Sequence, residues 1–139
     1  MRIGVTERGD AALDFLWYDK LKTGKYDGAI LITKNITPEF RNKVMQLHTS
    51  GHKLIVHATC TGWGGGPMEP NVPPYWQQMQ NLKELIADGF PMEQCVLRID
   101  PIIPTRSGLD AAYNVLCDAM ASGLLPKMRV RVSVLDEYK

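Results

Sequence analysis

Five short apolar runs alternate with four amphipathic segments along this chain, and this alternation constrains its fold more than any other feature. The runs cover residues 2–6, 29–33, 53–59, 94–100 and 128–135. Parallel strands need a long crossover connection, and a helix commonly supplies it. The sequence therefore predicts an α/β fold, a partial (β/α) barrel of about five parallel strands and about four helices. We expect one domain over residues 1–139.

The four helical segments have recognisable start signals. Asp10 is placed to cap a helix through residues 12–22, and Thr37 followed by Pro38 is placed to start the next one. The fourth segment follows Ser107 and Asp110, which nearly form a capping box. At helical spacing, one face of the second and third segments should carry the apolar residues Phe40, Val44, Leu47, Trp76, Met79, Leu82 and Ile86.

Composition excludes several classes of protein. The net charge of +1 is too small to predict binding to nucleic acid or to a membrane surface. The first residues are charged where a secretory signal is apolar, and no run approaches the roughly 20 apolar residues of a membrane span. The 3 cysteines are widely spaced, which argues against a disulfide framework. We expect a cytoplasmic protein with reduced thiols.

Each predicted strand separates into two faces, because strand side chains alternate. One face is apolar throughout, including Ile3 and Val5 in the first strand, as a surface beneath helices should be. An isolated buried charge costs several kcal/mol, so polar residues on the other face predict an open barrel that is wet or holds a polar ligand. Two alternatives remain: Arg98 pairs with Asp100 as a structural contact, or Arg131 lies on a solvated edge. The polar face consists of His57, Thr59, Arg98, Asp100, Arg131 and Ser133.

The long loop after the third strand is the strongest candidate for a binding element. Gly64, Gly65 and Gly66 can direct successive backbone N–H groups into an anion-binding nest, and Glu69 can hold a ligand amine or a ribose hydroxyl. The alternative is a flexible turn with one surface glutamate. The loop matches neither the phosphate-binding GxxxxGK[ST] pattern nor the dinucleotide-binding GxGxxG pattern.

Other combinations of residues support weaker hypotheses. His57 and Cys60 could begin a zinc site, but such a site needs about four ligands. A hydrolase using His57 and Asp100 is a further alternative. Cys95 and Cys117 are interpreted as small core residues, and the rigid Asp100-Pro101 turn is expected to end the fourth strand.

Two motifs carry a resemblance to a known family. TGWGGGPMEPNVPP (residues 61–74) and VLRIDPIIPT (residues 96–105) resemble the barrel core of spore photoproduct lyase-like radical S-adenosylmethionine proteins, in an uncharacterised branch. The opening RIGVTERGDAALDF, the strand end ILITKN and the closing SVLDEYK fit the same order of elements. The resemblance implies S-adenosylmethionine and a [4Fe–4S] cluster at the barrel mouth. It places the cofactor against Gly64, Gly65, Gly66 and Glu69, with His57, Thr59, Arg98 and Asp100 facing cofactor or substrate.

The chain departs from that family at the cluster motif. Cluster ligation needs three cysteines, usually CxxxCxxC, and Cys60, Cys95 and Cys117 do not form it. The chain is then either part of a longer barrel or a shortened relative without the cluster, and radical catalysis by these 139 residues alone is not expected. The first hypothesis is a barrel portion that binds a small zwitterionic or anionic cofactor. The alternative is a non-catalytic ligand-binding or assembly subunit that forms homo-oligomers or docks a partner through exposed sheet edges.

Overall fold

All five strands lie parallel in one sheet, in the order in which they occur along the chain. The computed structural model describes residues 1–136. Each neighbouring pair is joined by a crossover on the same side, which confirms the α/β fold and is consistent with a partial (β/α) barrel. The strands are β1 (Ile3–Val5), β2 (Gly28–Thr33), β3 (Lys53–Thr59), β4 (Cys95–Ile102) and β5 (Arg129–Val134).

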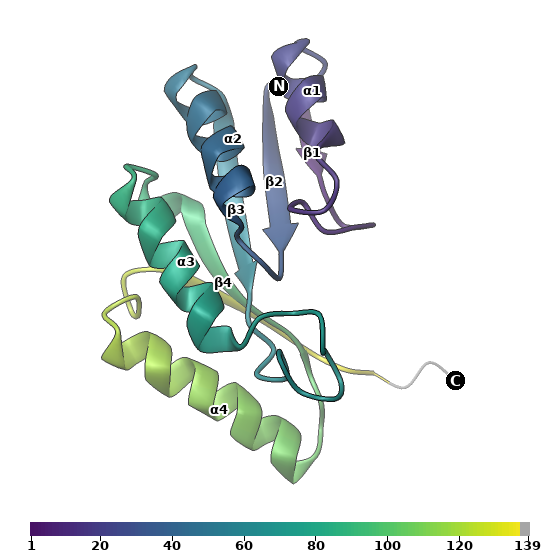
Figure 1. Ribbon diagram of the computed structural model, residues 1–139, viewed down its shortest axis with the longest axis vertical. Helices are drawn as coiled ribbons and strands as arrows, with labels where there is room; N and C mark the ends of the chain where they lie inside the picture. Colours follow the sequence, from purple (N-terminus) through teal and green to yellow (C-terminus); the bar gives the residue numbers. More distant parts are fainter. Residues whose placement is uncertain (137–139) are drawn as a thin grey trace.

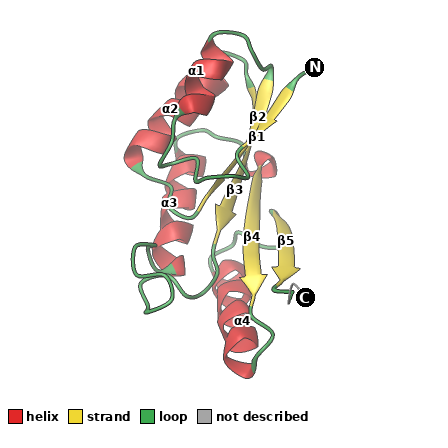
Figure 2. Cartoon of the chain, turned by 90° about the vertical axis from the view of Figure 1, so that its right-hand side faces the viewer, coloured by secondary structure: helices red, strands yellow, loops and turns green. Residues whose placement is uncertain are grey.

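The helices cover one face of the sheet and leave the other, here called the open face, without a helix (Figures 1 and 2). None of the helices within residues 1–136 is long and apolar enough to cross a membrane. The helices are α1 (Leu16–Lys22), α2 (Pro38–Thr49), α3 (Tyr75–Ala87) and α4 (Arg106–Ala121), and a short 3-10 turn, η1 (Met92–Gln94), precedes β4.

The core lies between the helices and the inner strands. Register aligns Leu31 of β2 with Val56 of β3, and Ala58 of β3 with Leu97 of β4. All four are buried, as is Ile99 of β4. The predicted apolar face of the third and fourth strands is therefore the face that packs beneath the helices.

The two outer strands depart from the expected pattern. Ile3 and Val5 align with Gly28 and Ile30, so they lie on the open face and not beneath helices. The reason is the register of β1, which turns Gly4 towards the Tyr26 ring on the helix side. In β5 the apolar residues do face the helix side, yet no helix of the described chain covers them. Their exposed fractions are 39% for Val130, 53% for Val132 and 59% for Val134.

Two helix starts differ from the prediction. The first helix begins at Leu16 and not after Asp10, because the Asp10 carboxylate accepts hydrogen bonds from Thr33 and Lys34 at the end of β2 as well as from the nearby Ala12 amide. The fourth helix is capped by Thr105, whose hydroxyl accepts a bond from the Gly108 amide at 3.1 Å. The predicted start of α2 is confirmed, with Thr37 accepting from the Phe40 amide.

The inward face of α3 is also different from the prediction. Trp76 is 60% exposed, whereas Gln78 is 1% exposed. The Gln78 side chain accepts a hydrogen bond from the Ile36 amide at 2.8 Å and donates one to the Thr33 carbonyl at 3.0 Å. These bonds hold the segment after β2 against α3, so a polar residue occupies a position that periodicity alone would assign to an apolar one.

Proline does not end β4. The pairing of β4 with β5 continues to Ile102, which aligns with Val134. Between Ile99 and this pair the register shifts, so that Asp100 and Pro101 together oppose the single residue Ser133. A proline within a sheet is tolerated at such a bulge, since its missing N–H is not needed there. The bulge redirects the Asp100 side chain towards β5.

Candidate functional site

A pocket of about 360 Å³ opens at the carboxyl ends of β1 to β4. The carboxyl edge is where parallel α/β sheets usually hold ligands. Basic and acidic side chains both line this pocket, which suits a ligand carrying both signs of charge. Its lining residues are Glu7, Gly9, Asp10, Ile32, Thr33, Lys34, Thr59, Arg98 and Asp100.

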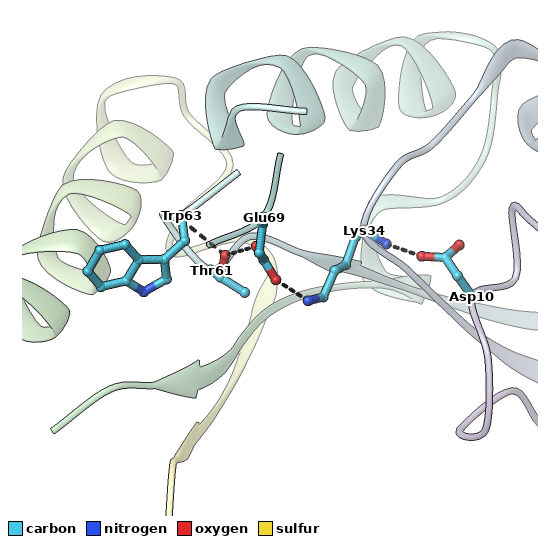
Figure 3. Close-up of polar contacts among 5 residues, drawn as sticks. All are labelled: Asp10, Lys34, Thr61, Trp63 and Glu69. Atoms are coloured by element: carbon cyan, nitrogen blue, oxygen red, sulfur yellow. Dashed lines mark hydrogen bonds and ion pairs between the residues drawn. The ribbon is translucent and has the colours of Figure 1, made fainter. Parts of the chain in front are cut away.

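Beside the pocket lies a group that we call the loop cluster: Asp10, Lys34, Thr61 and Glu69 (Figure 3). Of these, Asp10 and Lys34 line the pocket itself. The Lys34 ammonium pairs with one oxygen of the Glu69 carboxylate. The Thr61 hydroxyl donates to the other oxygen at 2.5 Å, and Thr61 in turn accepts a bond from the Trp63 amide at 3.1 Å. The cluster ties the end of β2 to the glycine-rich loop that follows β3.

Asp10 fixes the backbone from which Lys34 extends. Its carboxylate accepts the Thr33 hydroxyl at 2.6 Å and the Lys34 amide at 2.8 Å. Figure 3 shows Lys34 between the two carboxylates, with its amide towards Asp10 and its ammonium towards Glu69. The loop before α1 therefore helps to orient a lysine contributed by β2.

The glycines let the loop fold back on itself. An ideal Cβ at Gly64 would lie 2.1 Å from the Pro73 carbonyl oxygen, and Gly65 has φ of +79°, which favours glycine. The Gly65 amide donates to the Glu69 carbonyl at 3.0 Å, and the Gly66 amide donates to the Trp63 carbonyl at 3.1 Å. These amides hold the loop in shape, so the ligand-binding role predicted for the three glycines stays a prediction.

Arg98 and Asp100 supply the β4 part of the lining, and Ser133 of β5 bonds to Asp100. The Arg98 Nε donates to the Asp100 carboxylate at 2.9 Å, and the Ser133 hydroxyl donates to the other oxygen of that carboxylate. Burial raises the pKa of Asp100, but the bonds from Ser133 and Arg98 outweigh it and hold that pKa below its usual value. The structural pairing of Arg98 with Asp100, one of the two alternatives from the sequence, is therefore present.

Two buried nitrogen atoms on the open face have no hydrogen-bond partner within the described residues. They are Nη1 of Arg98 and Nδ1 of His57. His57 is 7% exposed, and its pKa is lowered by burial and then by Arg98, Arg131 and Arg129. A buried polar atom left unpaired costs about 1–3 kcal/mol. A ligand oxygen that accepted from Arg98 Nη1, or a ligand group that bonded His57 Nδ1 in either tautomer, would therefore stabilise the protein.

The residues predicted from the sequence fall in two places. His57, Arg98 and Asp100 meet on the open face with Thr59 beside them, since Thr59 aligns with Arg98. Glu69 lies outside the lining, paired with Lys34 and bonded through its carbonyl to the Gly65 amide. Sequence reasoning missed Asp10, Lys34 and Thr61 as site residues, although Asp10 and Lys34 each directly follow a predicted strand or its turn. Their position after the strands, at the carboxyl edge of the sheet, was the feature that could have identified them as site residues.

The cysteines do not fit an iron–sulfur cluster. Cys60 and Cys95 are buried, and burial raises the pKa of each thiol to about 12. Cys117 is exposed on α4, contrary to its interpretation as a core residue. Within residues 1–136 no group of three or more His, Cys, Asp and Glu side chains is placed to hold a metal ion. A cluster needs thiolate ligands, and these three do not converge.

The comparisons with known proteins identify one family. The family model described as Domain of unknown function (DUF1848) matches residues 16–139. No curated protein and no solved structure matches the chain. The match begins at the first residue of α1 and includes every strand from β2 onwards.

Proposed function

This chain belongs to the DUF1848 family, and we propose that it binds a small zwitterionic ligand of the S-adenosylmethionine type at the carboxyl ends of β1 to β4. The observation that carries the proposal is the pocket that Lys34 and Arg98 line together with the carboxylates of Asp10 and Asp100. An amino acid moiety presents one carboxylate and one ammonium group, and the charged residues that line the pocket offer partners for both.

The donor set fits that ligand. Arg98 has a free buried Nη1 for a ligand carboxylate, and Lys34 lines the same pocket. Asp10 and Asp100 offer acceptors for a ligand amine or hydroxyl, whereas an amine that approached Glu69 would compete with Lys34. The cofactor itself would supply a reactive sulfonium centre. The resemblance of residues 61–74 and 96–105 to spore photoproduct lyase-like radical proteins supports the choice of ligand.

Calorimetric titration of S-adenosylmethionine into the protein tests the proposal. We expect saturable binding that is lost in Arg98→Gln and in Gly65→Val, since valine is strained at φ of +79°. Arg106→Gln is the matched control, because Arg106 is exposed on α4 and its one ion-pair partner within residues 1–136 is Asp110. No heat at millimolar ligand with folded wild-type protein would contradict the proposal.

A second candidate function is an assembly role without catalysis. The observation that favours it is the uncovered apolar face of β5, together with the free edges of β1 and β5. Exposed strand edges pair readily with other chains. Sedimentation equilibrium distinguishes this role: mass that rises with protein concentration, in a protein that shows no ligand binding, would favour it over the first.

A further inference from the structure

The open face carries more positive charge than the proposed cofactor needs. Arg98 of β4 aligns directly with Arg131 of β5, and Arg129 aligns with Val96, the neighbour of His57. Adjacent strands are about 4.8 Å apart, so two guanidinium groups extend from neighbouring backbone positions on the same face. Like charges placed directly opposite each other destabilise a sheet unless something neutralises them.

The protein neutralises only part of this charge. Asp100 is the one carboxylate contributed to this face by β4, and both of its oxygens are already bonded, to Arg98 and to Ser133. Neither Arg129 nor Arg131 takes part in a salt bridge within the described residues. Arg129 donates a hydrogen bond from Nη2 to the Glu93 carbonyl at 3.2 Å, which does not neutralise its charge. Within the described residues, two of the three guanidinium charges therefore have no carboxylate at ion-pair distance.

The arginines of the open face differ in burial: Arg98 is largely buried, whereas Arg129 and Arg131 are exposed. The Arg98 side chain is 17% exposed, and its Nη1 is buried and unpartnered. The buried Nδ1 of His57 is unpartnered as well. Arg131 and Arg129 are exposed and lie towards the free edge of β5. A ligand entering from that edge would meet the exposed Arg129 and Arg131 before the buried His57.

We propose that Arg129 and Arg131, with His57 and beside the Arg98 that the cofactor carboxylate occupies, form a binding site for a dianionic oxyanion, of the phosphate or phosphate monoester class. A phosphate monoester carries about −1.5 to −2 charges at pH 7, which matches the two unbalanced positive charges, and the planar guanidinium fork bonds phosphate oxygens in pairs. The inference rests on the proposed function, because it assumes that the open face binds ligands. It adds that a second, phosphorylated ligand binds beside the zwitterionic one.

Inorganic phosphate is the probe, and the His57 ring is the reporter. Its NMR resonances are assigned with His57→Gln and titrated with pH, with and without phosphate, at constant ionic strength. The groups around His57 are Arg98, Arg129 and Arg131, with the apolar Ile32 and Val96 on the flanking strands. A bound dianion offsets the repulsion of these arginines, so phosphate raises the pKa of His57.

Substitution of a single arginine tests whether these arginines bind the phosphate. Arg131 is exposed, so Arg131→Gln leaves the fold intact and weakens phosphate binding about tenfold, the effect of losing one charge-assisted hydrogen bond. Arg106→Gln makes the same charge change on α4 and leaves binding unchanged. The proposal is overturned if phosphate leaves the His57 pKa unmoved, if both variants weaken binding equally, or if succinate, a dicarboxylate, shifts His57 more strongly than phosphate.

S-adenosylmethionine separates this inference from the proposed function. Phosphate binding without cofactor binding supports a phosphate site and contradicts the proposed function. Cofactor binding without phosphate binding supports the proposed function and contradicts the inference. Simultaneous binding of both supports both. Stoichiometric displacement of phosphate by S-adenosylmethionine would show that the arginines hold the cofactor carboxylate, which overturns the inference of a second ligand.

Discussion

The Lys34 ammonium pairs with the Glu69 carboxylate across 35 residues of sequence. This contact joins the end of β2 to the loop after β3, and Asp10 holds the Lys34 amide from the other side. The side-chain exposures of 38% and 16% place the pair at the pocket rim and not in the core. It therefore fixes the loop over the pocket more than it stabilises the whole fold.

Breaking this pair should loosen the loop. We expect Glu69→Gln to lower the free energy of unfolding by about 1 kcal/mol, since the pair is partly exposed. Hydrogen exchange should accelerate mainly in residues 61–74. Glu93→Gln is the control, because Glu93 is exposed and its side chain makes no ion pair in the described chain. Equal exchange in the two variants would show that the contact does not hold the loop.

The glycine-rich loop should tolerate no side chain at Gly64. Gly64→Ala places a methyl group against the Pro73 carbonyl and should cost about 1–3 kcal/mol of stability through overpacking. Gly9→Ala has open space around the added carbon and should leave the melting temperature nearly unchanged. Thermal unfolding followed by circular dichroism measures both. A Gly64→Ala protein as stable as wild type would mean that the loop rearranges freely.

Gln78 should be a positioning residue for the segment around Lys34. Gln78→Met keeps the volume but leaves the Ile36 amide and the Thr33 carbonyl without their partners. Each unpaired buried group costs about 1–3 kcal/mol, so chemical denaturation should show a loss of about 2–6 kcal/mol for the two groups. Gln77→Met, one position along α3, loses only a bond to Asn81 and should lose far less. Equal losses would contradict this role.

His57 should make stability depend on pH. Its pKa in the folded protein lies below 6.5, because burial and then Arg98 disfavour the charged ring. Its contribution is therefore present above pH 6.5 and is lost as the pH falls through the lower folded pKa. Denaturation midpoints measured across this window should fall in wild type. The fall should be smaller in His57→Gln, and an identical pH dependence would contradict the assignment.

The parts of the fold that sequence could predict are those set by local chemistry. The start of α2 depends on Thr37 and Pro38, which are adjacent, and the two faces of β3 and β4 follow from alternation alone. The grouping of His57, Arg98 and Asp100 followed from the same alternation, because neighbouring parallel strands present matching faces.

What sequence could not predict depends on partners distant in the chain. Asp10 was interpreted as a local helix cap, but its carboxylate bonds residues 23 and 24 positions away. Gln78 occupies a core position because its partners lie 42 and 45 residues earlier. The face of Ile3 and Val5 was set by the register of β1 against β2. Tertiary contacts of this kind leave no periodic signal in a single sequence.

The measurement that tests the central claim most directly is a nitrogen–proton NMR titration with S-adenosylmethionine. The claim is that a zwitterionic ligand binds at the carboxyl ends of β1 to β4. We predict saturable shifts concentrated at the amides of Gly9, Lys34, Thr59 and Asp100, all of which line the pocket. Shifts centred on the helices or on the amino ends of the strands, or no shifts at millimolar ligand, would contradict the account.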